Sequence, residues 1–200
     1  VCDVMGHGVQ PALVTAVVRG LVEELGPLAH DPGHLMTELN RDLTRLLQQP
    51  DQLIFVSTVC VAIDTESGVV SWANAGHPAP LLVRAGGDAI ERLTGDRAVT
   101  APAIGIDGGQ SYTTCRGELA AGDRLVLFTD GLYEMLDASG EEFGEERLIE
   151  AADAGRSGVL GEMLDGILGA VETYAGTDEL SDDVCLVGVE VSQLVEASGR

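Results

Sequence analysis

Leu125-Val126-Leu127-Phe128-Thr129-Asp130-Gly131 is a short apolar run that ends on an aspartate and a glycine. Two other stretches also place an aspartate beside an apolar run: Val1-Cys2-Asp3, and Asp182-Asp183 before Val184-Cys185-Leu186-Val187. A carboxylate is costly to hold beside a buried strand unless a cation compensates its charge. Three such positions, far apart in the sequence, indicate carboxylates gathered around a hard metal ion, which prefers oxygen ligands.

Length, charge and hydrophobicity narrow the class of protein. The 200-residue chain has a formal net charge of -22 and a hydrophobic content of 45%. This length suits one domain with a substantial core, which we expect over residues 1–195, with a frayed tail at 196–200. The negative charge disfavours nucleic-acid or anionic-membrane binding as the main activity. No apolar run approaches the roughly 20 residues of a membrane span, so no transmembrane segment is predicted.

Hydrophobic spacing divides the chain into helical segments and β-hairpins. Helical spacing predicts helices at residues 11–25, 32–48, 145–154 and 160–174. Strands are expected at residues 54–64, 69–75, 80–84, 91–93, 110–119, 124–129 and 184–191. Turn-type residues predict three hairpins with loops at 65–68, 85–88 and 120–123. Because helices segregate from hairpins, the pattern favours an α+β fold over a doubly wound parallel sheet.

The four cysteines form no C-x-x-C pair that would indicate zinc or redox chemistry. Cys60 and Cys185 lie in strand-like apolar runs, and we expect both to be small buried core residues. This cysteine usage and the lack of a signal peptide favour a cytoplasmic protein. Val1 opens in the middle of an apparent strand, so the chain has the character of a fragment.

The segment Asp3-Val4-Met5-Gly6-His7-Gly8 leaves a strand and enters a glycine-rich turn. Glycines allow positive φ and a close approach of the backbone to an ion, and a peptide carbonyl there could also ligate it. Taken singly, Asp3 is better explained as a strand-end or turn-capping carboxylate, and Asp130 is a weak signal that a turn also explains. Side chains of neighbouring strand residues point to opposite faces, so we expect only one of Asp182 and Asp183 to point into a site.

Five segments resemble, in the same order, the motifs of one family. They are DVMGHGVQPA at 3–12, ANAGHPAP at 73–80, AIGI at 103–106, GDRLVLFTDGLYE at 122–134 and SDDV at 181–184. The corresponding motifs are D-x-x-G-H-G-x-x-A-A, N-A-G-H-P-P/A-P, P-L-G-L, G-D-x-L-x-L-x-T-D-G-x-x-E and D-D-x-T/C-L. The chain therefore resembles the bacterial SpoIIE/RsbU-type serine/threonine phosphatases, a branch of the PPM (PP2C-like) metal-dependent phosphatases.

The resemblance implies a fold and a set of metal ligands. The fold would be a PP2C-like sandwich of two antiparallel β-sheets flanked by helices, with two Mn2+ or Mg2+ ions. Asp3 matches the carboxylate that bridges both ions, and the carbonyl of Val4 matches a peptide ligand of one. Asp130 and Asp182 match the carboxylates that complete the second ion's shell, and Asp183 takes a neighbouring position of lower rank. Asp3, Asp130 and Asp182 would act in catalysis through a metal-activated water.

The resemblance also implies a reaction and a protein substrate. The reaction is hydrolysis of phosphoserine or phosphothreonine on a bacterial regulatory protein, for which a phosphorylated anti-sigma-factor antagonist of the STAS type is a candidate. Two divalent ions would reverse the local charge of an aspartate cluster. They would also lower the pKa of a bridging water, so that no covalent phosphoenzyme is required. A sensor domain before Val1 and a homodimer are both compatible with this class.

Two histidines have alternative interpretations. His7, between Gly6 and Gly8, is either an acid for the leaving group or a residue that holds the metal-binding turn through a hydrogen bond. His77 is interpreted mainly as a turn-organising residue, with the Asn74 side chain bonded to the backbone.

One departure keeps a second functional class open. Related phosphatases carry a further acidic residue on a strand that precedes the one with Asp3, and we expect that N-terminal strand to be missing here. The alternative to an active enzyme is therefore a catalytically weak or inactive regulatory binding module on a phosphatase fold. Retention of Asp3, Asp130 and Asp182 favours the enzyme, because a module without catalysis need not keep clustered carboxylates.

Overall fold

The computed structural model describes residues 1–47, 54–87, 89–95, 101–177 and 182–194. The chain divides into two compact units, the first built from Val1–His77 and Thr94–Glu118, the second from Pro78–Leu93 and Leu119–Val195. The expected tail at 196–200, the helix end at Gln48 and the motif residue Ser181 lie outside the described residues, and the domain boundary at 195 stays a prediction.

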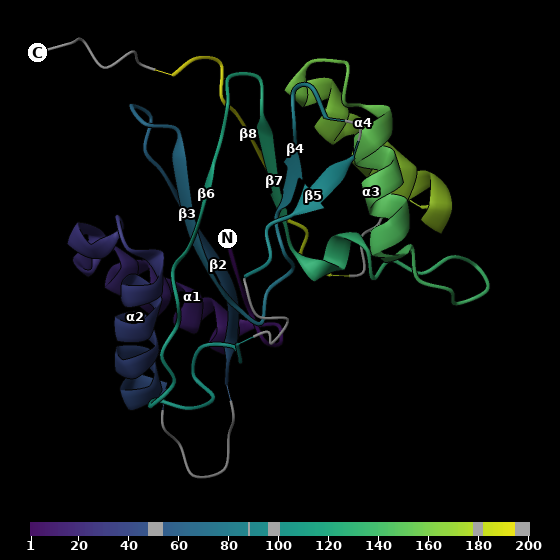
Figure 1. The fold of residues 1–200 in the computed structure, drawn as a ribbon. Helices are drawn as coiled ribbons and strands as arrows, with labels where there is room; N and C mark the ends of the chain where they lie inside the picture. Colours follow the sequence, from purple (N-terminus) through teal and green to yellow (C-terminus); the bar gives the residue numbers. More distant parts are fainter. Residues whose placement is uncertain (48–53, 88, 96–100, 178–181, 195–200) are drawn as a thin grey trace, which may run out of the picture. The chain divides into compact units, whose positions relative to one another are not determined.

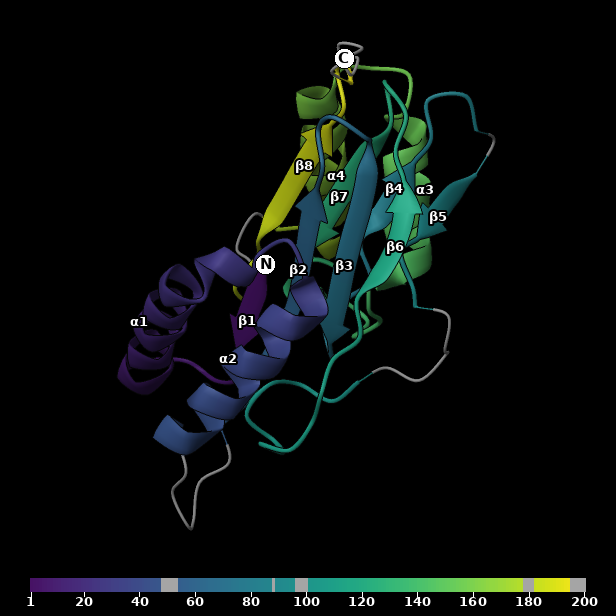
Figure 2. The ribbon, with the colours of Figure 1, turned by 60° about the vertical axis from the view of Figure 1, so that its left-hand side comes forward.

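The first unit is an antiparallel sheet with two helices on one face (Figure 2). In the described part of the chain its strand order is β1-β2-β3-β6. The strands are β1 (Cys2–Val4), β2 (Val56–Ile63), β3 (Val69–Ala75) and β6 (Cys115–Glu118). The helices are α1 (Val9–Glu24), the short 3-10 turn η1 (Gly26–Leu28) and α2 (Pro32–Leu47).

The helices of the first unit form because each carries an apolar stripe at helical spacing. On α2 this stripe is Leu35, Met36, Leu39 and Leu43, all of them buried. They pack in one cluster with Val14 and Val18 of α1 and with Val56, Ala73 and Ala75 of the sheet. Val56 and its strand partner Val4 therefore lie on the face of the sheet that meets the helices. Because neighbouring side chains alternate between faces, Asp3 and its partner Ser57 project from the opposite face.

The second unit is also an antiparallel sheet with two helices, which lie together in Figure 1. Its strand order among the described residues is β5-β4-β7-β8. The strands are β4 (Leu81–Val83), β5 (Ile90–Arg92), β7 (Arg124–Phe128) and β8 (Leu186–Glu190). The helices are the 3-10 turn η2 (Asp130–Leu132), α3 (Gly144–Ala154) and α4 (Leu160–Ala175). Leu148 of α3 and Met163, Ile167 and Val171 of α4 pack against Leu81, Val126 and Phe128.

These elements confirm the α+β class with two antiparallel sheets and flanking helices. The four helices and the first two hairpins, β2–β3 and β4–β5, form where the sequence predicted them. Among the described residues no helix combines the length and the apolar character needed to cross a membrane.

The prediction of a third hairpin, between the strands at 110–119 and 124–129, is wrong. The turn at 120–123 forms, with the Asp123 N–H donating to the Ala120 carbonyl. The strands on its two sides nevertheless do not pair, because β6 pairs with β3 whereas β7 pairs with β4 and β8. All of 125–128 is buried, as expected of a central strand with a neighbour on each side. β6 is short and polar, so it would not bury enough apolar surface beside the buried strand β7.

The expectation for the cysteines is half correct. Cys60 is half-buried and packs against the first core. Cys185 is exposed, because it lies just before β8 in the segment that leads from Asp183 into the strand.

Candidate active site

Asp3 and Val4 lie at the end of β1, and hydrogen bonds to β2 continue as far as the next residue, Met5. Asp3 lies in register with Ser57, and Val4 with Val56. The Met5 N–H then donates to the Phe55 carbonyl at 3.1 Å, which closes the β1–β2 pairing. Gly6 and Gly8 follow with φ of 92° and 99°, a backbone region that favours glycine. The predicted glycine-rich turn is therefore present, and it leads directly into α1.

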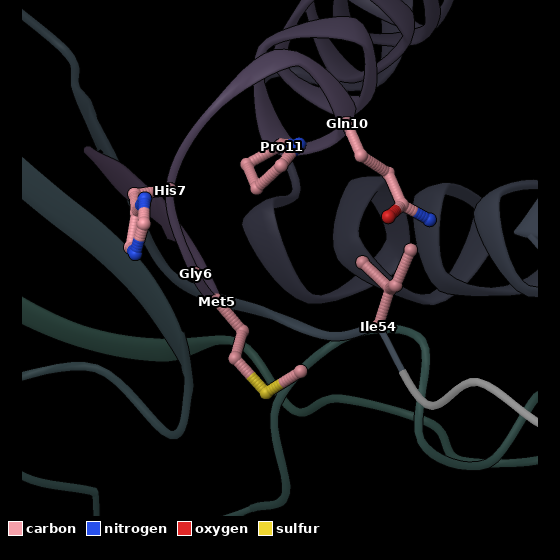
Figure 3. Close-up of a pocket in the computed structure, with 6 residues that line it drawn as sticks. All are labelled: Met5, Gly6, His7, Gln10, Pro11 and Ile54. Atoms are coloured by element: carbon pink, nitrogen blue, oxygen red, sulfur yellow. The ribbon is translucent and has the colours of Figure 1, made fainter.

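An open pocket lies beside this turn (Figure 3). Its lining residues are Met5, Gly6, His7, Gln10, Pro11 and Ile54. The volume is about 200 Å³, and Met5, Pro11 and Ile54 make its apolar wall. His7 and Gln10 bring polar groups to it, and the His7 side chain is exposed. The structure thus places His7 in the turn after Asp3, where a polar ligand can reach it.

The buried His77 contacts Ser57, the strand partner of Asp3, and is held from two sides. His77 Nδ1 and Ser57 Oγ are 2.8 Å apart. The Asn74 side chain donates to the His77 carbonyl at 2.8 Å and accepts the His77 N–H at 2.9 Å. The turn-organising role predicted for Asn74 and His77 is confirmed. The Ser57 contact was not predicted from the sequence, since it depends on the register of β2 against β3, in which Thr58 lies opposite Ala75.

Asp130 begins η2 directly after the buried strand β7. Its carboxylate accepts the Gly131 N–H at 3.1 Å, and its carbonyl accepts the N–H of Tyr133 at 2.9 Å and of Glu134 at 3.0 Å. The backbone at Asp130 is therefore ordered on both sides, by the strand before it and the helical turn after it.

The segment with Asp182 and Asp183 is tied to Thr129, the residue before Asp130. The Thr129 N–H donates to the Cys185 carbonyl at 3.0 Å. The Thr129 hydroxyl donates to the Asp183 carbonyl at 3.0 Å and accepts the Cys185 N–H at 2.9 Å. Together these bonds continue the β7–β8 pairing beyond Phe128 and Leu186. They bring Asp130 and Asp182, 52 positions apart in the chain, to the same end of one sheet.

Asp182 and Asp183 are both exposed. The Asp182 carboxylate accepts the Asp183 N–H at 2.8 Å, so that it folds back over its own backbone. Gly131 allows the close approach of this segment, because a Cβ there would lie 3.1 Å from the Asp182 Cβ. The T-D-G triplet is the only sequence signal for Thr129 and Gly131, and their contacts could not be predicted from it.

The end of this sheet concentrates negative charge. Burial, followed by the charges of Asp130, Glu142 and Asp182, raises the pKa of Glu134 above its usual value. Burial, followed by Asp130 and other carboxylates, raises the pKa of Tyr133 to about 12. Like charges raise a carboxyl pKa because they disfavour its ionised form. A bound cation would relieve this repulsion.

The predicted ligands are divided between the two units. Asp3 and Val4 belong to the first unit, and Asp130, Asp182 and Asp183 belong to the second. Within the described ranges, no three His, Cys, Asp or Glu side chains converge on a ready-made metal site. What the structure brings together is the pair Asp130 and Asp182, with Glu134 nearby.

Comparison with known proteins places the chain in one sequence family. The sequence profile described as Stage II sporulation protein E (SpoIIE) matches residues 1–192. Phosphoserine phosphatase RsbP of Bacillus subtilis (strain 168) is 26% identical over 192 residues, which are 96% of this chain and 45% of that protein. The chain spans less than half the length of the curated relatives it matches.

Two solved structures share the fold. The SiaA-PP2C domain of Pseudomonas aeruginosa superposes with a TM-score of 0.79 at 21% identity, over 94% of this chain and 73% of that chain. The structure of the RsbU and RsbW domains of Rv1364c from Mycobacterium tuberculosis gives a TM-score of 0.75 at 22% identity, over 97% of this chain and 52% of that chain. At these identities the likeness establishes the fold alone.

Proposed function

Because the chain belongs to the SpoIIE family, we propose that it is a phosphoprotein phosphatase that hydrolyses phosphoserine or phosphothreonine. RsbP, with 26% identity over 192 residues, is named a phosphoserine phosphatase, which supports this reaction. The proposed substrate is a phosphorylated bacterial regulatory protein, with an anti-sigma-factor antagonist of the STAS type as the first candidate.

The observation that carries the proposal is the pairing of Asp130 with the Asp182 segment through Thr129 and Gly131. Clustered carboxylates are costly without a cation, and the charges of Asp130 and Asp182 add to the effect of burial in raising the pKa of Glu134. Carboxylate and carbonyl oxygens are the ligands that hard divalent cations prefer. The residues present therefore fit Mn2+ or Mg2+ by the chemistry of their donor atoms.

The proposed ligands of two such ions are the Asp3 and Asp130 carboxylates, the Val4 carbonyl and the Asp182 carboxylate, with Asp183 ranked below Asp182. When bound, divalent ions supply Lewis acidity and a nucleophilic water for displacement at phosphorus. The chain's own part is to hold these oxygens in place, and bound divalent ions would offset the repulsion between a phosphate and a chain of net charge -22. His7, exposed beside the pocket, is the proposed proton donor to the leaving serine or threonine oxygen.

Replacement of one ligand tests the proposal. Release of phosphate from a phosphoserine protein of the STAS type would be measured with the 200-residue chain, with Mn2+ and with EDTA. We expect Asp130→Asn to lower the rate by about 100-fold or more, because loss of a metal ligand removes several kcal/mol of transition-state stabilisation. EDTA should abolish the wild-type activity.

Asp165→Asn is the matched control, because it removes the same charge from the exposed surface of α4. Its rate should equal that of the wild type. An Asp130→Asn chain as active as the wild type would contradict the assigned ligands. A folded wild-type chain that binds the phosphoprotein but releases no phosphate in Mn2+ would favour the binding module instead.

A further inference from the structure

The hydroxyl of Thr129 has a determined hydrogen-bond direction. The Cys185 backbone N–H can only donate, so Thr129 Oγ1 accepts it at 2.9 Å. The Asp183 carbonyl can only accept, so the single hydroxyl proton points to it at 3.0 Å. The side chain is 3% exposed, so water does not substitute readily for either bond. One hydroxyl therefore holds two backbone groups that flank Val184.

These bonds are not needed to hold the strands together. β7 and β8 already pair through five registered residue pairs, from Arg124 with Glu190 to Phe128 with Leu186. The Thr129 side chain acts beyond that ladder, where the chain at 182–185 is no longer a strand. Its effect is on the segment that carries Asp182 and Asp183.

Gly131 sets how closely that segment approaches Asp130. A Cβ at this position would lie 3.0 Å from the Asp183 carbonyl oxygen and 3.1 Å from the Asp182 Cβ. The first of these neighbours is backbone, so a methyl group could be admitted only if the segment shifted by a few tenths of an ångström. The φ of Gly131 is not positive, so the reason for glycine here is space.

We propose that Thr129 and Gly131 are positioning residues that set the separation between the Asp130 and Asp182 carboxylates and thereby the affinity for a divalent cation. Thr129 pulls the Asp182 segment toward the end of β7, and Gly131 leaves room for it. The proposal rests on the proposed function for the role of the cation. It adds two residues that would not bind the cation themselves but control the geometry of the two carboxylates proposed to bind it.

Mn2+ binding to the 200-residue chain measures this role without reference to turnover. Electron paramagnetic resonance of free Mn2+ gives the dissociation constant for each variant. We expect Thr129→Val, which keeps the shape but loses the hydroxyl, and Gly131→Ala each to raise the Kd by about 10-fold or more, as for other outer-shell groups of metal sites. Thr129→Ser, which restores the hydroxyl, should stay within about threefold of the wild type.

Two controls make the same chemical changes elsewhere. Thr58 is 7% exposed and its hydroxyl has no hydrogen-bond partner among the described residues, so Thr58→Val should leave the Kd unchanged. Gly166→Ala adds a methyl to an exposed position of α4 that has open space around it. In the metal-free chain, amide exchange at Cys185 should be faster in Thr129→Val than in the wild type, which reports loss of the bond directly.

The outcomes separate this proposal from the proposed function. Wild-type Mn2+ affinity in folded Thr129→Val and Gly131→Ala chains would overturn the positioning role, even if the wild type hydrolyses phosphoprotein. Weakened affinity in both variants, beside a wild type that binds Mn2+ but hydrolyses nothing, would support positioning and overturn the phosphatase. A wild type that takes up no Mn2+ would overturn both.

Discussion

Asp123 is a buried carboxylate that is almost fully hydrogen-bonded. It is 2% exposed, and it accepts the backbone N–H groups of Ala85 and Ala120 at 2.9 Å each. Arg84 Nη1 lies 2.9 Å from the same carboxylate. Burial by itself acts to raise the pKa of Asp123, but the two backbone N–H groups and Arg84 outweigh it and hold the pKa below its usual value. The residue therefore anchors the turn before β7 in its ionised form.

Asp123→Asn should lower the free energy of unfolding by about 2 kcal/mol at neutral pH, because hydrogen bonds to a charged acceptor are lost or weakened. A carboxyl group with a lowered pKa stabilises the fold above its unfolded pKa of about 3.9, and this contribution disappears as the pH falls through the folded value. Urea unfolding of both chains between about pH 7 and pH 3 measures it. The difference between wild type and variant should shrink at acid pH, and a constant difference would contradict the ionic role.

At the scale of elements, Asn40 joins α2 to the loop at 105–110. It is 0% exposed, its amide donates to the Asp107 carbonyl at 2.8 Å, and its oxygen accepts the Gly105 N–H at 2.9 Å. Asn40→Leu keeps the branched outline of the side chain but leaves these part-buried backbone groups without the amide that pairs with them. We expect the free energy of unfolding to fall by about 3 kcal/mol.

Chemical denaturation of Asn40→Leu beside Leu46→Ala checks this expectation. Leu46 is 62% exposed near the end of the same helix, so its truncation should change stability by less than about 0.5 kcal/mol. An Asn40→Leu chain as stable as Leu46→Ala would mean that the loop relaxes to water once the amide is removed.

Local sequence predicted most elements but not all of their partners. The stripe on α2 and the turn at 65–68 are local signals, and both elements form as expected. The apolar run of β7 identified a strand and the turn at 120–123 suggested its neighbour, which proved wrong. Hydrophobic periodicity says which residues are buried, and it carries no information on which strand lies alongside.

At the scale of the whole molecule, the net charge of -22 acts on every encounter with a charged substrate. The proposed substrate carries a phosphate, and an acidic phosphoprotein should be repelled at low ionic strength. Between about 10 mM and 150 mM salt the Debye length falls from about 30 Å to about 8 Å. We expect kcat/KM for an acidic phosphoprotein to rise by about threefold or more over this range, with little change in kcat.

A basic phosphopeptide is the control for this salt dependence, because it should be attracted and its kcat/KM should fall with salt over the same range. The same slope for both substrates would show that salt acts on the protein itself and that steering by net charge is unimportant.

The sequence by itself determined the positions of Asp3 and Asp130, since a strand that ends in a glycine-rich or helical turn is specified by residues within one or two turns of chain. It also determined the family, because the five motifs keep their order. Only the tertiary structure decided that Asp182 lies beside Asp130 and Gly131, through Thr129. That contact joins residues about 50 positions apart. It exists because β7 pairs with β8. This pairing depends on the burial of the whole sheet against its helices rather than on either segment alone.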